Sequence, residues 1–133
     1  MRRAVLADAG PLYAAADPDD THHRRAQEDL RRLASEKRDV LVAYPTLLEA
    51  HALVLRRLGR KQATVWLDEI LKSSASVDPV VEDYLEGVMK LNFLPDQSIT
   101  LFDATLAAVG ARLKVEIWTY DHHFDVMRAK VWR

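Results

Sequence analysis

Short apolar runs alternate with longer amphipathic stretches along this chain. The apolar runs have the length of buried strands, and within the amphipathic stretches apolar residues recur every three or four positions, as on one face of a helix. We predict strands at 4–6, 40–43, 76–78 and 115–118, with 130–132 as a candidate edge strand. We predict helices at 12–16, about 20–37, 46–58, 62–71, about 80–92 and 103–113. This alternation favours a three-layer α/β/α domain with a short, mainly parallel sheet, although it leaves the strand order open.

Length and composition narrow the class of protein. The 133 residues fit one domain over 1–133, and the 49% apolar content with only 4 Gly argues against a disordered or fibrous chain. The chain has no Cys, which excludes a disulfide framework, thiolate catalysis and a Cys-based zinc site. The first apolar stretch is too short for a signal peptide or a membrane span, so we expect a cytoplasmic protein with no membrane partner. A net charge of −1 does not by itself indicate nucleic-acid binding.

Four acidic residues stand where an apolar run gives way to a helix start: Asp8, Glu49, Asp103 and Asp121. In a parallel α/β sheet the helix N-termini gather at the carboxyl edge of the sheet, where ligand sites form. Four carboxylates that meet there repel one another unless protons or a hard cation neutralise them. The sequence therefore predicts a divalent-metal site at this edge.

Each acid also has a local explanation. Asp8 suits an Asx turn, and Asp121 suits a cap on the turn through 122–124. Thr46 and Thr100 each precede one of the other two acids by three residues, which is the spacing of a capping box. Caps and turns give carboxylates no reason to converge, so spacing alone does not decide between these interpretations.

Five blocks of sequence surround or connect the acids, at 5–12, 17–26, 47–50, 103–108 and 119–124. Together, in this order, they resemble the PIN-domain proteins, and specifically the VapC-type toxin ribonucleases. The last block, Thr-Tyr-Asp-His-His-Phe, is similar to the family's T-x-D-x-x-F ending. Ala9 stands where many members have Ser or Thr, and Asp125 follows the aromatic residue rather than preceding it, which leaves its role as a helper open.

The resemblance implies a PIN-like α/β/α domain with an acidic pocket that holds Mg²⁺ or Mn²⁺. It also implies an endoribonuclease that cleaves single-stranded regions of RNA, often tRNA or rRNA, and acts as the toxin of a toxin–antitoxin pair. A cognate VapB-like antitoxin and a homodimer are the implied protein partners.

Roles for the individual residues follow from that chemistry. We expect Asp8 and Asp103 to be direct metal ligands, and Asp121 to complete the site or to bind through a water. Glu49, with its longer reach, would hold a metal-bound water or act as the base, and the Thr119 hydroxyl would orient Asp121 or a water. Whether one metal ion or two would bind stays open.

Other residues allow weaker predictions. Cations for RNA are available at Arg24 and Arg25, and at Arg56, Arg57, Arg60 and Lys61, although charge runs more often form solvated helix faces. Tyr120 and Tyr13 flank the predicted site and could stack on bases, with packing the stronger expectation for Tyr13. The pairs His22–His23 and His122–His123 do not favour zinc, because neighbours on a helix point apart. Trp66 and Trp118 have the spacing of core residues.

Three alternatives remain, two phosphate-handling folds and one binding module. Receiver domains and haloacid-dehalogenase-like hydrolases also place an Asp after the first strand. The former would need acids where Leu6 and Ala7 stand, and the latter an Asp where Gly10 stands. A non-catalytic PIN-like module that binds RNA or protein is the more serious alternative, and the four intact acids argue against it.

Overall fold

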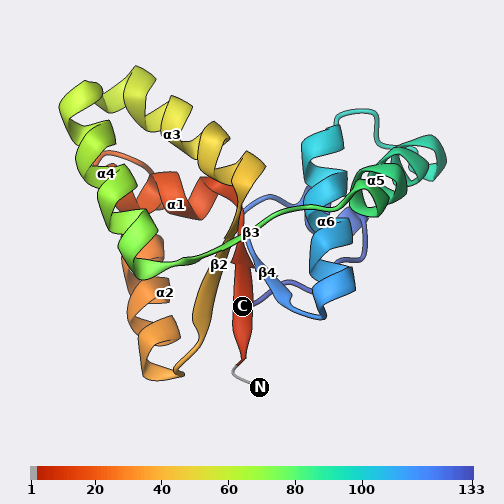
Figure 1. Ribbon diagram of the computed structural model, residues 1–133, viewed down its shortest axis with the longest axis horizontal. Coiled ribbons are helices and arrows are strands. Elements are labelled where there is room, and N and C mark those ends of the chain that lie inside the picture. Colours follow the sequence, from red (N-terminus) through yellow and green to blue (C-terminus); the bar gives the residue numbers. More distant parts are fainter. Residues whose placement is uncertain (1–2) are drawn as a thin grey trace.

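The computed structural model describes residues 3–133 and shows a parallel sheet with helices on both faces (Figure 1). The strands are β1 (Ala4–Ala7), β2 (Asp39–Ala43), β3 (Ala75–Val77) and β4 (Glu116–Trp118), in the order β3-β2-β1-β4, and every pairing is parallel. The three-layer α/β fold predicted from the alternation of elements is therefore confirmed. The order puts β1 in the interior of the sheet, next to β4.

Two groups of helices cover the sheet. On one face lie α1 (Ala9–Ala16), α2 (His23–Ser35), α3 (Tyr44–Leu58) and α4 (Arg60–Ser73). On the other lie α5 (Val81–Phe93), α6 (Leu101–Leu113) and the single turn α7 (His123–Val126). Val5 packs into the first apolar cluster and its neighbour Leu6 into the second. Because β1 is buried on both faces, it reads as a continuous apolar run rather than an alternating one.

The structure corrects several predicted elements. The helix expected at 12–16 begins at Ala9, directly after the cap residue Asp8. The helix expected to open at Thr46 begins at Tyr44, because Pro45 in its first turn has a preset φ and no N–H to satisfy. The candidate edge strand at 130–132 is a single parallel bridge between Ile117 and Val131. The turn expected at 122–124 continues into α7.

None of the helices within residues 3–133 combines the length and apolarity that crossing a membrane requires.

Candidate metal centre

A cleft of about 500 Å³ opens where β1 and β4 end, between the starts of α1 and α6 and the face of α3 that carries Glu49, Leu53 and Arg57. The four predicted acids all line it: Asp8, Glu49, Asp103 and Asp121. Tyr13, Tyr120, Arg57 and His122 also contribute to its wall. The structure therefore brings the four carboxylates together at the carboxyl edge of the sheet. We call this the acidic cleft.

Asp8 is the most buried of the four acids, with 7% of its surface exposed. It directly follows β1 and caps α1, and its carboxylate accepts hydrogen bonds from the Ala9 amide and the Thr119 hydroxyl, each at 2.8 Å. Burial raises the pKa of Asp8 to about 6, and the charges of Asp103 and Glu49 add to this rise, while the two hydrogen bonds oppose it. Asp8 thus carries a charge that the fold alone stabilises poorly.

Thr119 connects two of the acids. Its hydroxyl donates to Asp8 and accepts a hydrogen bond from the backbone amide of Asp121 at 3.0 Å. The Asp121 carboxylate in turn accepts from the His123 amide at 2.9 Å, so the turn anticipated for Asp121 is also formed. Thr119 therefore orients the Asp8 side chain and the Asp121 backbone together.

Asp103 is the electrostatic centre of the acidic cleft. It lies in the first turn of α6, where its amide donates to the Thr100 hydroxyl at 3.1 Å. Burial raises its pKa, followed by the charge of Asp121, and Thr100 partly opposes the rise. The charge of Asp103 also raises the pKa of Asp8 and of Glu49. Repulsion therefore links Asp103 to each of the other three acids.

Glu49 lies at the rim of the acidic cleft, on the second turn of α3. Burial raises its pKa, and the charge of Asp103 adds to that effect. The capping box that Thr46 and Glu49 could have formed does not occur: α3 starts earlier, and the buried Thr46 hydroxyl has no hydrogen-bond partner within the described chain. The Glu49 carboxylate therefore does not cap α3 and lines the acidic cleft instead.

These residues fit a hard divalent cation. Carboxylate oxygens are the ligands that Mg²⁺ and Mn²⁺ prefer, and a cation would relieve the repulsion that raises the pKa values. Asp103, Asp121 and His123 each offer one ligand atom, and these atoms all lie within 4.8 Å of one another. The donor set and its spacing suit such an ion.

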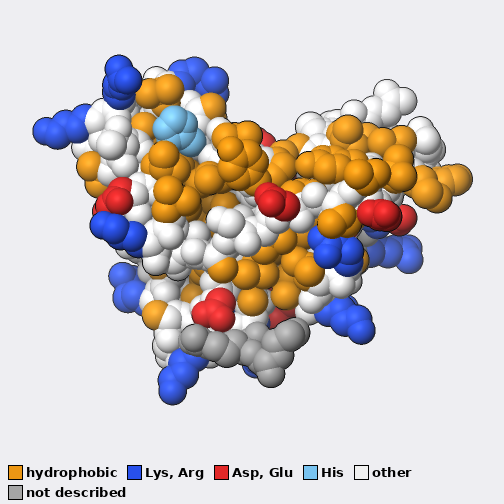
Figure 2. Space-filling view, in the orientation of Figure 1, with side chains coloured by type: hydrophobic (Ala, Val, Ile, Leu, Met, Phe, Trp, Pro, Cys, Tyr) orange, Lys and Arg blue, Asp and Glu red, His pale blue; other side chains and the backbone are white. Residues whose placement is uncertain are grey.

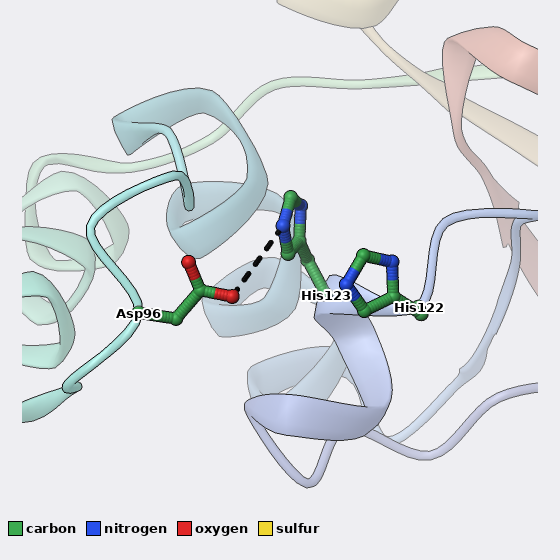
Figure 3. Close-up of side chains that lie close together, drawn as sticks. All are labelled: Asp96, His122 and His123. Atoms are coloured by element: carbon green, nitrogen blue, oxygen red, sulfur yellow. Dashed lines mark ion pairs between the residues drawn. The ribbon is translucent and has the colours of Figure 1, made fainter.

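His123 is the neighbour of the acids that sequence reasoning missed. Its Nδ1 lies 3.1 Å from an Asp121 oxygen and 3.8 Å from an Asp103 oxygen, and its Nε2 lies 2.9 Å from the Ser98 hydroxyl. Figure 3 shows His123 facing Asp96; the His123 Nε2 atom lies 3.6 Å from an Asp96 carboxylate oxygen. No spacing rule in the sequence joins the loop before α6 to the start of α7, so only the fold reveals this contact.

The expectation that His122 and His123 point apart is wrong. Their ring centroids lie 4.4 Å from each other, at an interplanar angle of 41°. With Asp96 they form a second cluster of ligand-type atoms beside the acidic cleft.

Two of the basic candidates contact tyrosines near the acidic cleft, while other aromatic candidates pack in the core. Arg57 borders the acidic cleft, and its guanidinium lies 5.1 Å from the Tyr13 ring centre, while Arg25 lies 4.2 Å from the ring centre of Tyr120. Tyr13 is 4% exposed and packs in the core, as do Trp66 and Trp118, in agreement with the prediction from their spacing.

Asp125, whose role the sequence left open, lines a neighbouring hollow with Asp121 and Arg133. Its carboxylate accepts from the Arg133 guanidinium at 2.6 and 2.8 Å, and it is absent from the described wall of the acidic cleft.

Comparison with known proteins finds likeness in structure and not in sequence. No family model and no curated protein sequence matches this chain. Among solved structures, VapC20 of Mycobacterium tuberculosis, a sarcin-ricin loop cleaving toxin, superposes with a TM-score of 0.82 at 20% identity, over 98% of this chain and 99% of that one. VapBC2 from Rickettsia felis, bound to a DNA fragment from its promoter, superposes with a TM-score of 0.76 at 14% identity, over 98% of this chain and 97% of that one. FitAcB from Neisseria gonorrhoeae superposes with a TM-score of 0.70 at 19% identity, over 97% of this chain and 96% of that one. The chain has the PIN-like α/β/α fold of the VapC-type proteins that its five sequence blocks resemble.

Proposed function

We propose that this protein is a Mg²⁺- or Mn²⁺-dependent endoribonuclease that cleaves single-stranded regions of RNA and acts as the toxin of a toxin–antitoxin pair. One observation carries the proposal: the four predicted acids, with Asp20 as a fifth carboxylate, line a single cleft of about 500 Å³ although the chain spaces them far apart. Mutual repulsion makes such an arrangement costly unless a cation uses it. The structural likeness to VapC20 supports the same chemistry.

Each of the four predicted acids, and Thr119 beside them, receives a role in this proposal. Asp8, Asp103 and Asp121 would hold the cation, which supplies a lowered pKa for bound water and charge stabilisation on the phosphoryl oxygens. Glu49 would bind the attacking water and accept its proton while the bond from phosphorus to the leaving oxygen breaks. Thr119 is a positioning residue, because its hydroxyl fixes Asp8 and the Asp121 backbone.

The partners follow the same reasoning. VapC20 is a toxin that cleaves the sarcin-ricin loop, so ribosomal RNA is a natural first substrate to test, with tRNA beside it. We also propose a VapB-like antitoxin as a partner and a cytoplasmic site of action.

A cleavage assay tests the enzymatic claim. Purified protein is incubated with tRNA and with an rRNA hairpin in Mn²⁺ or Mg²⁺, and the products are separated on denaturing gels. Cleavage should require the metal and stop with EDTA. Asp8→Asn should lower the rate at least about 100-fold, because it removes a charge that holds the cation. Asp68→Asn, a surface carboxylate that pairs with Lys72, is the matched control and should cleave normally.

Two results would count against the enzyme. Cleavage that survives chelation would exclude the metal role, and cleavage unchanged in a folded Asp8→Asn variant would exclude the assignment of Asp8. RNA binding without any cleavage would instead favour the non-catalytic PIN-like module.

A further inference from the structure

A second hollow, of about 390 Å³, lies along the second half of α6, between that helix, the start of β4 and the segment after α7. Its floor consists of small and apolar residues of these elements. Its rim carries four cationic side chains, those of Lys90, Lys114, Arg128 and Lys130. None of the described residues that line it is a carboxylate. We call this hollow the basic cleft.

The four cations of the basic cleft have no ion pair or hydrogen bond through their side chains within residues 3–133. Other basic residues of the fold do: Arg38 pairs with Glu36 at 2.7 Å, and Arg112 pairs with Asp83 at 2.9 Å. Compensation of a helix dipole accounts for Lys114, which caps α6, and for Lys90 in the last turn of α5. It does not account for Arg128 and Lys130, which follow the single turn α7. Like charges gathered over an apolar floor create a positive potential suited to an anion.

A series of neighbouring residues lies between the two clefts. Lys90 and Met127 also line an adjoining hollow with Phe93, whose ring is 82% exposed and available for stacking. Asp96 follows three residues later and lies 3.6 Å from His123, which in turn lies 3.8 Å from Asp103 in the acidic cleft. Cations, an exposed aromatic ring and the acids thus succeed one another along the α6–α7 side of the molecule.

We propose that the basic cleft binds the phosphate backbone of the same RNA strand that is cut in the acidic cleft, an inference that rests on the proposed ribonuclease function. The acidic cleft repels phosphates, so most of the affinity for a polyanion has to come from cations elsewhere. The 13 residues of α6 span about 20 Å at a rise of about 1.5 Å each, so a strand of a few nucleotides reaches from one cleft to the other.

Salt dependence of RNA binding tests this proposal. The probe is a fluorescein-labelled single-stranded RNA long enough to span both clefts, titrated in EDTA so that binding is measured without cleavage. The test variant is Lys114→Gln/Lys130→Gln, which removes both charges, shortens each side chain by only one atom and, at the positive φ of Lys114, adds no strain that lysine did not have. The control, Arg31→Gln/Lys72→Gln, removes the same charge from α2 and α4.

The expected result is a smaller salt effect in the test variant only. Loss of two phosphate contacts lowers the slope of log affinity against log salt by about 1.4, at about 0.7 per contact for a single strand, and weakens binding roughly tenfold or more at low salt. The control should keep the wild-type slope. An RNA too short to leave the acidic cleft should bind both variants equally.

Three outcomes would overturn the proposal. The first is a wild-type slope in the test variant, and the second is an equal loss in both variants, which would show a general charge effect. The third is a loss seen with a DNA duplex and not with RNA, which would make the basic cleft a DNA contact. Each of these leaves the cleavage assay unaffected, so failure here and failure of the ribonuclease function are separate results.

Discussion

A single hydroxyl organises the acidic cleft at the scale of residues. Thr119 is 4% exposed, donates to the buried Asp8 carboxylate and accepts from the Asp121 amide. A carboxylate in a poorly solvated place depends on such donors, because water cannot replace them. Two of the four acids therefore depend on one side chain that is not itself charged.

Thr119→Val should separate this role from simple packing, because it keeps the shape and removes the hydroxyl. We expect a loss of about 1–3 kcal/mol in the free energy of unfolding and a loss of about 10–100-fold in activity or in affinity for Mn²⁺. Thr46→Val is the matched control, because that hydroxyl is buried with no partner in the described chain, and its loss should be neutral or stabilising. Urea unfolding and Mn²⁺ titration of cleavage measure the two effects. Equal behaviour of the two variants would deny Thr119 its positioning role.

Asp8 should make the metal-free protein less stable as pH rises. Burial raises its pKa from 3.8 to about 6, so the folded state holds the proton more tightly than the unfolded state. The contribution of Asp8 is fully favourable below pH 4 and is lost between pH 4 and pH 6, at a cost of about 3 kcal/mol above that window. Glu49 and Asp103, whose pKa values are also raised, act in the same direction.

Urea unfolding in EDTA between pH 4 and pH 7 measures this effect. The wild-type protein should lose stability across the window, and Asp8→Asn should lose clearly less, because it has no charge to acquire. Parallel curves for the two proteins would show that the charge on Asp8 costs the fold nothing.

At the scale of elements, the sequence predicted the edge at which the acids meet better than the residues at which helices begin. The junction positions of Asp8 and Asp103 follow from apolar periodicity, which is a local signal. The predicted start of α3 at Thr46 was wrong, because Pro45 favours the first turn of a helix and the helix begins two residues earlier, at Tyr44. The contacts of His123 with Asp96 and Asp103 could not be predicted, because only tertiary packing brings the loop before α6 and the first turn of α6 near α7.

The contact between α5 and α6 depends on one glycine. A Cβ atom on Gly87 would lie 2.9 Å from the Thr105 hydroxyl and 3.1 Å from the Thr105 amide nitrogen. Gly87→Ala should therefore destabilise the fold by about 1–3 kcal/mol, although alanine is favoured over glycine by about 1 kcal/mol in a helix. Gly10→Ala, in α1 with no atom within 4 Å of the added carbon, should stabilise it instead. Thermal unfolding measures the stability of both variants. A higher stability of both would show that α5 and α6 can move apart to accommodate the added carbon on Gly87.

At the scale of the whole molecule, the meeting of the four acids depends on strand order. The sequence could predict a parallel sheet and a shared edge, but pairing of β1 with both β2 and β4 is a non-local choice that short apolar runs do not encode. The basic cleft illustrates the same limit, because Lys90 and Lys130 are 40 residues apart and give no local signal. A net charge of −1 conceals both clefts, one acidic and one basic.

The outer face of α5 carries an apolar stripe that suits a homodimer. Val81, Tyr84, Leu85 and Val88 recur at helical spacing and are 41–68% exposed, and Figure 2 shows apolar side chains gathered over α5. Exposed apolar stripes of this kind more often mark an interface than a solvated surface. We predict a dimer in solution and a monomer for Leu85→Glu, because the new charge would be buried without a partner. Leu71→Glu on α4 is the control: leucine there is 57% exposed, close to the 59% of Leu85, and the variant should remain dimeric. Light scattering coupled to size-exclusion chromatography gives the mass of each, and a dimeric Leu85→Glu or a monomeric wild type would rule out this stripe as the interface.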